Sequence, residues 1–244
     1  MQCFGHRGAA GEAPENTVAG FLYARSRGVR AFEFDVHRTA DNELAVIHDD
    51  RLDRTTNATG AVYSYTAEQL AGLDARAEFP EWPVRVGVPT LEEVLAVVPG
   101  CQLQIEIKSD TADNLEMVCG RLAVILRDEE LASRTVVSSF DEQALANMQR
   151  LAPAIPRSLI ARFATMQELE RAAELACCWI CPHLPSTSKA LVHAAQNSGM
   201  KVCAWMGNTP EELATLVAWG VEAVTTDYPS IALAYLCEHG ILEL

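Results

Sequence analysis

The chain has 244 residues and a mass of 26.6 kDa, enough for one large domain or two small ones, and its composition, 49% hydrophobic and 21% charged, is that of an ordinary globular protein. A formal charge of −14, from 19 Lys and Arg against 33 Asp and Glu, argues against nucleic acid as a partner, because a polyanion would be repelled. The sequence contains neither an apolar run of about 18 residues nor a basic and apolar leader, so we expect no membrane insertion and a cytoplasmic location.

Short apolar or alternating runs recur along the chain between amphipathic stretches. In chain order, the runs that predict strands are 3–4, 32–36, 44–47, 103–107, 135–140, 159–161, 179–181, 201–205 and 223–226. The helix signals between them are the capping boxes Thr66 with Gln69 and Thr90 with Glu93, the start Thr209-Pro210-Glu211-Glu212, and the terminal glycines Gly28, Gly199 and Gly220. This alternation predicts an α/β fold.

Two spacings depart from the rhythm of one strand and one helix. Phe34 and Ile47 are only 13 residues apart, which is too short for a helical crossover. Residues 37–43 must therefore either turn a hairpin or return in extended form to start a parallel strand. Ile47 and Ile105 are 58 residues apart, and we predict a small insertion over 51–88 followed by a helix from about Thr90.

The number of repeats favours a closed barrel over an open sheet. Roughly eight βα repeats in a chain of about 250 residues predict one (β/α)8 TIM-type barrel over 1–244, with the insertion after the strand that ends at His48. No Gly-x-Gly-x-x-Gly follows the first strand, which disfavours a dinucleotide-binding fold. Nine candidates compete for eight barrel positions, so we expect one to be wrong, and 159–161 is the weakest. Chemistry is expected at the carboxyl ends of the strands.

Carboxylates alternate with apolar residues in two predicted strands, 32–36 and 103–107. Either pattern alone would also fit a solvated strand face or a surface ion pair. In a barrel the apolar residues should face the helices, which leaves these charged residues at the interior or its rim: Glu33, Asp35, Glu106 and Lys108. Because buried like charges require neutralisation and no thiolate is expected nearby, we predict a site for one divalent cation, Mg²⁺ or Ca²⁺.

Two of the six histidines follow predicted strands, His6 after the first and His48 after the third. A single histidine is more often structural, but two at equivalent strand ends beside a predicted metal favour an acid and base pair. Arg7 can bind a phosphate or carboxylate through its forked guanidinium, and Lys108 supplies a point charge. Three carboxylates, a divalent cation and these two residues leave one net positive charge, which suits a small anion such as a phosphodiester.

The eight cysteines are expected in a reducing compartment, mostly as small core residues. Cys178 and Cys181 match Cys-x-x-Cys, but they lie in a predicted strand without a second pair at zinc-site spacing. We therefore do not predict zinc or redox chemistry there.

Ordered segments along the chain resemble the glycerophosphodiester phosphodiesterase family. The matching segments are His6-Arg7-Gly8, Pro14-Glu15-Asn16-Thr17, Glu33-Phe34-Asp35, His48-Asp49, Arg54-Thr55-Thr56, Pro89-Thr90-Leu91, Glu106-Ile107-Lys108, Ser138-Ser139-Phe140 and Thr226-Asp227-Tyr228-Pro229. Each is weak alone, but the ordered set spans nearly the whole chain and is highly specific. The resemblance implies a (β/α)8 barrel with a small insertion. It also implies metal ligands Glu33, Asp35 and Glu106, an acid/base pair His6 and His48, and phosphate contacts from Arg7 and Lys108.

The same resemblance implies metal-dependent hydrolysis of a small-molecule glycerophosphodiester to sn-glycerol 3-phosphate and an alcohol. One histidine would accept a proton from the nucleophile, either water or the glycerol 2-hydroxyl, and the other would protonate the leaving alkoxide. The sequence leaves the order of the two roles open. The family commonly has Trp-Thr-Val-Asn where this chain has Trp205-Met206-Gly207-Asn208, so Trp205 is either a wall for the glycerol or alcohol group or a core residue.

Two other functions remain as alternatives. A lysophospholipase D-like phosphodiesterase acting at a membrane would need an exposed apolar rim or an amphipathic anchor, and the acidic charge of the chain argues against it. A non-catalytic phosphate-binding module would not need a paired acid and base. The sequence does not identify the preferred alcohol group, and it leaves a homodimer open.

Overall fold

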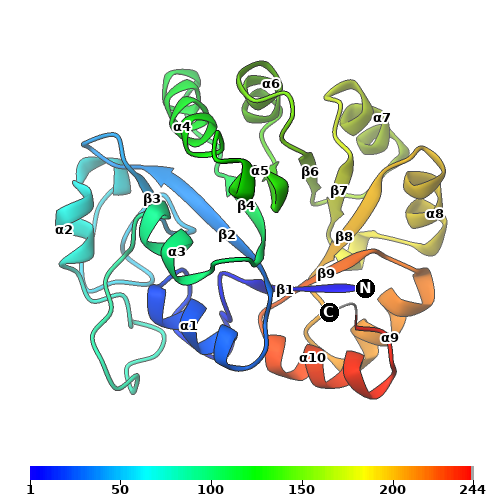
Figure 1. Cartoon of the computed structure of the whole chain (residues 1–244), viewed down its shortest axis with the longest axis horizontal. Coiled ribbons are helices and arrows are strands. Elements are labelled where there is room, and N and C mark those ends of the chain that lie inside the picture. Colours follow the sequence, from blue (N-terminus) through cyan, green and yellow to red (C-terminus); the bar gives the residue numbers. More distant parts are fainter. Residues whose placement is uncertain (243–244) are drawn as a thin grey trace.

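Eight parallel strands close into a barrel in the computed structural model, which describes residues 1–242 (Figure 1). The strands are β1 (Gln2–His6), β2 (Ala31–Arg38), β4 (Gln102–Ile107), β5 (Thr135–Ser139), β6 (Arg157–Ala161), β7 (Trp179–Pro182), β8 (Lys201–Trp205) and β9 (Ala223–Thr226). Each pairs with the next, and pairs of β1 with β2 and β9 close the ring. The predicted TIM-type fold is confirmed. The last two residues of the domain predicted over 1–244 lie outside the described residues.

Helices surround this barrel (Figure 1). They are α1 (Val18–Ser26), α2 (Ala67–Ala71), α3 (Leu91–Val97), α4 (Ala112–Ile125), α5 (Glu129–Ser133), α6 (Glu142–Leu151), α7 (Met166–Glu174), α8 (Lys189–Asn197), α9 (Pro210–Trp219) and α10 (Pro229–Glu238), with 3-10 helices η1 (Val62–Ser64) and η2 (Leu184–Ser186). The predicted capping boxes at Thr66 and Thr90 are present, so amides at these helix starts have acceptors. Within residues 1–242, no helix has the length and apolarity needed to cross a membrane.

All nine predicted strands form, but only eight belong to the barrel, so one of the nine candidates was surplus as expected. The surplus candidate is not 159–161, which had been expected to be the weakest. Residues 159–161 lie within β6, a full member of the barrel. The additional strand is β3 (Leu44–Val46), which pairs antiparallel with the outer end of β2 and stays outside the barrel. Of the two routes open to residues 37–43, the hairpin is correct, because an antiparallel return needs only a short turn and no crossover.

The β2–β3 hairpin brings the chain back to the mouth of the barrel. The backbone N–H of Ile47 donates to the carbonyl oxygen of Asp35 at 3.2 Å. His37 Nε2 lies 3.0 Å from the carbonyl oxygen of His48, to which it donates. His48 therefore stands at the mouth although it follows an antiparallel strand, and the expectation that it follows a barrel strand was wrong.

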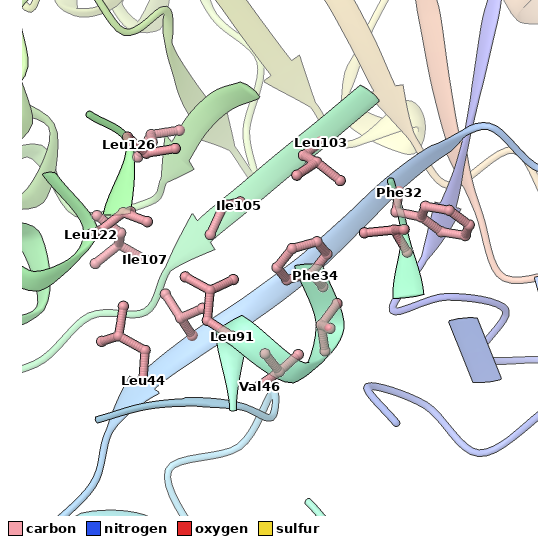
Figure 2. Packing of buried hydrophobic residues seen from close by; sticks show 14 of the residues in the cluster. Phe32, Phe34, Leu44, Val46, Leu91, Leu103, Ile105, Ile107, Leu122 and Leu126 are labelled. Atoms are coloured by element: carbon pink, nitrogen blue, oxygen red, sulfur yellow. The ribbon is translucent and has the colours of Figure 1, made fainter. Parts of the chain in front are cut away.

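Apolar residues on the outer faces of β2 and β4 pack beneath the surrounding helices. Phe21 of α1 contacts the rings of Phe32 and Phe34 edge-on, with both centroid distances 5.4 Å. Figure 2 shows the same two phenylalanines beside side chains of β3, β4 and α3, including Leu44, Leu103 and Leu91. Burial of each such side chain contributes about 1.5–3 kcal/mol. Because the apolar side chains of these strands point outward to the helices, the alternate residues face the barrel interior.

The cysteines are free thiols, and six of the eight are buried, as expected for small core residues. Cys181 is inside the barrel, where its Sγ lies 3.1 Å from Ser158 Oγ and accepts from Gln104 Nε2 at 3.4 Å. Cys178 is exposed. The two cysteines of the Cys-x-x-Cys pattern therefore have different surroundings and do not form one site.

Candidate active site

A cavity of about 280 Å³ opens at the carboxyl ends of the barrel strands. Every second residue of a strand faces the barrel interior, and this series continues to the carboxyl end of the strand, as Phe4 and His6 show on β1. Seven of the eight predicted site residues line the cavity: His6, Arg7, Glu33, His48, Glu106, Lys108 and Trp205. The eighth, Asp35, is fully buried next to Glu33 and Glu106. The structure thus brings residues from β1 to β8 into one place.

Three carboxylates meet on the wall formed by β2 and β4. Glu33, Asp35 and Glu106 each offer an oxygen atom within 4.8 Å of the others, and their exposed fractions are only 4%, 0% and 6%. Parallel pairing sets Asp35 beside Glu106. The buried Oε2 of Glu33 has no hydrogen-bond partner among the described residues. An unpartnered buried carboxylate oxygen is costly, and an oxygen-only set of donors fits a hard divalent cation. The residues present therefore fit a bound metal ion.

Burial and neighbouring charges give the three carboxylates of this cluster different protonation states. Burial and the charge of Asp35 raise the pKa of Glu33 well above its usual range, and the same causes raise the pKa of Glu106 to about 7. Asp35 behaves in the opposite way. Although burial works against its ionisation, Lys108 and Arg7 hold its pKa well below the usual range. Without a cation, the cluster combines one firmly ionised carboxylate with two that retain protons more readily.

The two predicted phosphate-binding cations contact these carboxylates. Lys108 Nζ lies 2.7 Å from Glu106 Oε1 and 3.3 Å from Asp35 Oδ1. Arg7 Nε lies 3.4 Å from Asp35 Oδ2, and Arg7 Nη1 donates to Glu15 Oε1 at 3.0 Å. An ammonium group carries three donors and a guanidinium five. Because both side chains also line the cavity, each has N–H groups left for an anion there.

His6 is held by a carboxylate from the far end of the chain. Its Nδ1 lies 2.5 Å from Asp227 Oδ1, and its Nε2 lies 3.7 Å from Glu33 Oε2. Asn208 positions the carboxylate: its Nδ2 donates to Asp227 Oδ2 at 2.7 Å, and its Oδ1 accepts from the Asp227 backbone N–H at 2.9 Å. A carboxylate at Nδ1 favours the tautomer with a proton there. This arrangement leaves Nε2 directed toward the carboxylate cluster.

His48 has the same kind of support from its neighbour in sequence. Its Nδ1 lies 2.6 Å from Asp49 Oδ1, and Arg54 Nε donates to Asp49 Oδ2 at 2.7 Å. The hydrogen bond from Arg54 is the main cause that lowers the pKa of Asp49 to about 2. Burial lowers the pKa of His48, although Asp35 opposes this effect, so the neutral ring is favoured. Both histidines therefore have one nitrogen tied to an ionised carboxylate.

A continuous network of charges links the two sides of the mouth. Both terminal nitrogens of Arg54 donate to the carboxylate of Glu15 at 2.8 Å, and Glu15 in turn accepts from Arg7. Arg54 also donates to Glu78 Oε2 of the 51–88 segment at 2.9 Å. A bidentate arginine–carboxylate pair has restricted geometry. The network therefore orients Asp49, and through it His48, relative to Arg7.

Asn16 was given no role in the sequence analysis, although its segment was among those that match the family. Its Nδ2 donates to Asp35 Oδ2 at 2.9 Å, so it orients a predicted metal ligand. Asn16 and Arg7 both have left-handed backbones, with φ of 54° and 50°. This conformation costs roughly 1–2 kcal/mol for most residues and less for asparagine. Backbone hydrogen bonds from Arg7 to Glu33 at 2.7 Å and from Asn16 to Arg7 at 2.9 Å hold the loop.

Other residues of the site were likewise given no role from the sequence, among them Asp49, Asp227 and Asn208. Asp49 could have been found from its place next to His48. Asp227 could have been found from the inward period of β9, where it follows Thr225 by two positions. Asn208 could have been noticed as the asparagine that this chain shares with the family segment Trp-Thr-Val-Asn, but its contact to Asp227 depends on the packing of two loops.

Trp205 forms a wall of the cavity, and its half-buried ring also packs against the apolar cluster inside the barrel. Its Nε1 donates to the carbonyl oxygen of Cys181 at 2.9 Å. The ring of Phe140 meets it edge-on at a centroid distance of 5.9 Å. Since the indole N–H has an acceptor and the ring has an aromatic neighbour, the orientation of Trp205 is set before any ligand binds.

The 51–88 segment reaches the mouth next to His6. Its apolar side chains pack with residues of the β2–β3 hairpin, among them Leu52 and Leu70 with Ile47. Glu78 and Phe79 line a second, more open cavity of about 530 Å³ that His6 also borders. The segment therefore covers the side of the mouth where Arg54 and Glu15 meet.

Comparison with known proteins gave consistent matches. A family model described as the Glycerophosphoryl diester phosphodiesterase family matches residues 6–231. YhdW of Bacillus subtilis is 32% identical over 96% of this chain and 97% of its own length. A glycerophosphodiester phosphodiesterase of Caldanaerobacter subterraneus subsp. tengcongensis is 30% identical, over 92% and 93%. The structure of an Oleispira antarctica phosphodiesterase in complex with the product sn-glycerol-3-phosphate superposes with a TM-score of 0.90 and 28% identity, over 97% of each chain.

Proposed function

The chain belongs to the glycerophosphoryl diester phosphodiesterase family, and we propose that it hydrolyses glycerophosphodiesters to sn-glycerol 3-phosphate and an alcohol with one bound divalent cation, Mg²⁺ or Ca²⁺. One observation carries the proposal: three buried carboxylates and two carboxylate-supported histidines line or border the same cavity. The product bound to the similar Oleispira antarctica phosphodiesterase supports this substrate class. The cytoplasmic location stays a prediction.

Glu33, Asp35 and Glu106 would hold the cation. When bound, it supplies positive charge that stabilises the charge developing on the phosphoryl oxygens. Arg7 and Lys108 add N–H donors for the same oxygens from the wall of the cavity. Phosphoryl transfer depends mainly on such positioning and charge stabilisation, so these five residues would supply the electrostatic part of catalysis.

His6 and His48 act as a general acid and base pair. Because Asp227 and Asp49 favour a proton on Nδ1, the Nε2 atom of a neutral ring can accept a proton from the nucleophile. The nucleophile is either water or the glycerol 2-hydroxyl, and the second route forms a cyclic phosphate first. The other histidine, in its protonated form, gives its proton to the leaving alkoxide. Each proton therefore moves between a ring nitrogen and a substrate or water oxygen.

The test is release of sn-glycerol 3-phosphate from glycerophosphocholine and glycerophosphoethanolamine, with and without chelator. Exhaustive dialysis against EDTA should abolish release, and Mg²⁺ or Ca²⁺ should restore it. A Glu106→Ala variant should remain folded by circular dichroism but lose the response to metal. Full activity in excess EDTA would overturn the metal requirement. No release from either diester with metal present would overturn the function itself.

A second substrate class has one observation in its favour. Phe140 lines the cavity and is 37% exposed, and Phe163, two positions beyond the end of β6, is 69% exposed. Exposed aromatic side chains beside an active site suit an acyl chain, which a lysophospholipase D-like activity would require. Lysophosphatidylcholine in the same assay tests this function. Release of lysophosphatidate at a rate comparable to diester hydrolysis would support it, and no release would exclude it.

A further inference from the structure

One half of the cavity has no part in the chemistry proposed so far. In the closed strand order, β6 lies four strands from β1 in both directions, and so directly opposite His6. Phe140, Arg162 and Trp205, at the ends of β5, β6 and β8, line this half. A substrate whose phosphate lies between Arg7 and Lys108 would extend one of its two ester groups toward β6.

Arg162 occupies an inward-facing position of β6. Ser158 and Ile160 are the preceding inward residues, since Ser158 contacts Cys181 inside the barrel and Ile160 packs in the interior apolar cluster. Arg162 continues this two-residue series just beyond the strand. Ser186 holds the segment: its Oγ donates to the Arg162 carbonyl oxygen at 2.7 Å and accepts from the Ala164 N–H at 3.2 Å. The backbone that presents Arg162 is therefore held against the loop after β7.

Among residues 1–242 the guanidinium of Arg162 has no acidic partner. Within residues 1–242 its side chain makes no hydrogen bond or ion pair, whereas Arg7, Lys108 and Arg54 at the other side of the mouth all contact carboxylates. The protein carries 33 acidic residues against 19 basic ones, which makes an unpaired arginine at the cavity notable. Its five N–H donors form a planar fork that matches pairs of phosphate or carboxylate oxygens. The chemistry of this half of the cavity suits an anion.

We propose that Arg162 binds a second anionic group of the substrate, so that the enzyme prefers glycerophosphodiesters whose alcohol carries its own phosphate. This inference rests on the proposed hydrolysis of glycerophosphodiesters and names the substrate class that this site prefers. Trp205 and Phe140 supply the rigid apolar wall along which the alcohol lies. The opposite arrangement, a cationic choline against these aromatic rings, is disfavoured because Arg162 repels it.

Three substrates separate charge from all other effects. Glycerophosphoglycerol has a neutral alcohol, bis(glycerophospho)glycerol has the same alcohol extended by a second phosphodiester, and glycerophosphocholine has a cationic alcohol. Arg162→Ala should lower kcat/KM about 10-fold for bis(glycerophospho)glycerol, which is the loss expected for one charge-assisted hydrogen-bonded contact. The same substitution should change kcat/KM for glycerophosphoglycerol by less than about two-fold, a small fraction of that loss, and should raise kcat/KM for glycerophosphocholine. Bis(glycerophospho)glycerol has two equivalent bonds that the enzyme can hydrolyse, but the effect of this on kcat/KM is the same for variant and wild type and cancels when the two are compared.

Lys189→Ala is the matched control. Lys189 is the exposed first residue of α8, lies at the same end of the barrel after β7, and does not line the cavity. Its removal subtracts the same charge and should leave the ratios among the three substrates unchanged. Arg162→Lys, which keeps the charge but loses the fork, should fall between wild type and Arg162→Ala on the bis compound. Added salt should weaken the preference for that compound in wild type.

Equal changes on all three substrates, or an unchanged ratio, would overturn the proposal. A wild-type enzyme that hydrolyses none of them would overturn the proposed function instead. In that case calorimetric titration of the wild type and Arg162→Ala with bis(glycerophospho)glycerol still decides the role of Arg162. A dissociation constant raised about 10-fold by the substitution supports it, and equal constants reject it.

Discussion

Replacing Glu106 by glutamine should stabilise the metal-free protein and make it insensitive to metal. Burial and Asp35 raise the pKa of Glu106 from its ordinary 4.5 to about 7. The unfolded chain loses this proton near pH 4.5 and the folded, metal-free chain near pH 7, so the folded state loses stability as the pH rises through this window. At pH 8 the cost is about 3 kcal/mol. Glutamine removes that cost but also weakens the contact to Lys108, 2.7 Å away, which offsets part of the gain.

We therefore expect the free energy of unfolding of metal-free Glu106→Gln to exceed that of wild type by about 1–2 kcal/mol at pH 8. For a chain of this size, this corresponds to a melting temperature higher by about 2–8 °C. At pH 5 most of the difference should vanish. Saturating Mg²⁺ or Ca²⁺ should then reverse the order, because a ligand at 100 times its dissociation constant stabilises wild type by about 2.7 kcal/mol and the variant lacks one ligand. The measurement is thermal unfolding followed by circular dichroism, in EDTA and in metal.

Glu170→Gln on α7 is the control, since it removes one negative charge from an exposed position. It should change neither the pH dependence nor the response to metal. If metal-free Glu106→Gln is less stable than wild type at pH 8, or if metal raises both melting temperatures equally, the three carboxylates do not form a cation site of the kind described.

Other predictions concern the histidines, their supports and the insertion. His6→Ala and His48→Ala should each lower turnover of glycerophosphocholine about 10²- to 10⁴-fold, and the variant of the acid should lose far less on a nitrophenyl diester, whose leaving group needs little protonation. Retention of more than about half of wild-type turnover by both variants would make them structural residues. Asn208→Ala should lower kcat about 10- to 100-fold, because Asp227 loses two hydrogen bonds, and an unchanged kcat would contradict this. Trimming residues 79–82 should change relative rates among diesters more than melting temperature, and unchanged selectivity would reject a role for the insertion in substrate choice.

Local periodicity in the sequence was sufficient to predict the class of fold and the inward-facing positions of the carboxylates. In 32–36, apolar and acidic residues alternate, and only one face of a strand can pack under helices. Because the apolar face must be outside the barrel, Glu33 and Asp35 had to be inside it. Helix starts such as Thr66 and Thr90 were predictable for a similar reason, since a capping box involves residues only three positions apart.

Contacts between distant segments were decided by the tertiary structure alone. Residues 37–43 were compatible with a hairpin or a parallel return, and only the pairing of β3 along the outer end of β2 selected the hairpin. That pairing places His48 at the mouth, although His48 does not follow a strand of the barrel. Likewise His6 meets Asp227 across 221 positions because β1 and β9 are neighbours in the closed barrel. Side-chain alternation determines which face a residue occupies, but partners across the mouth depend on strand order and closure, which involve the whole chain at once.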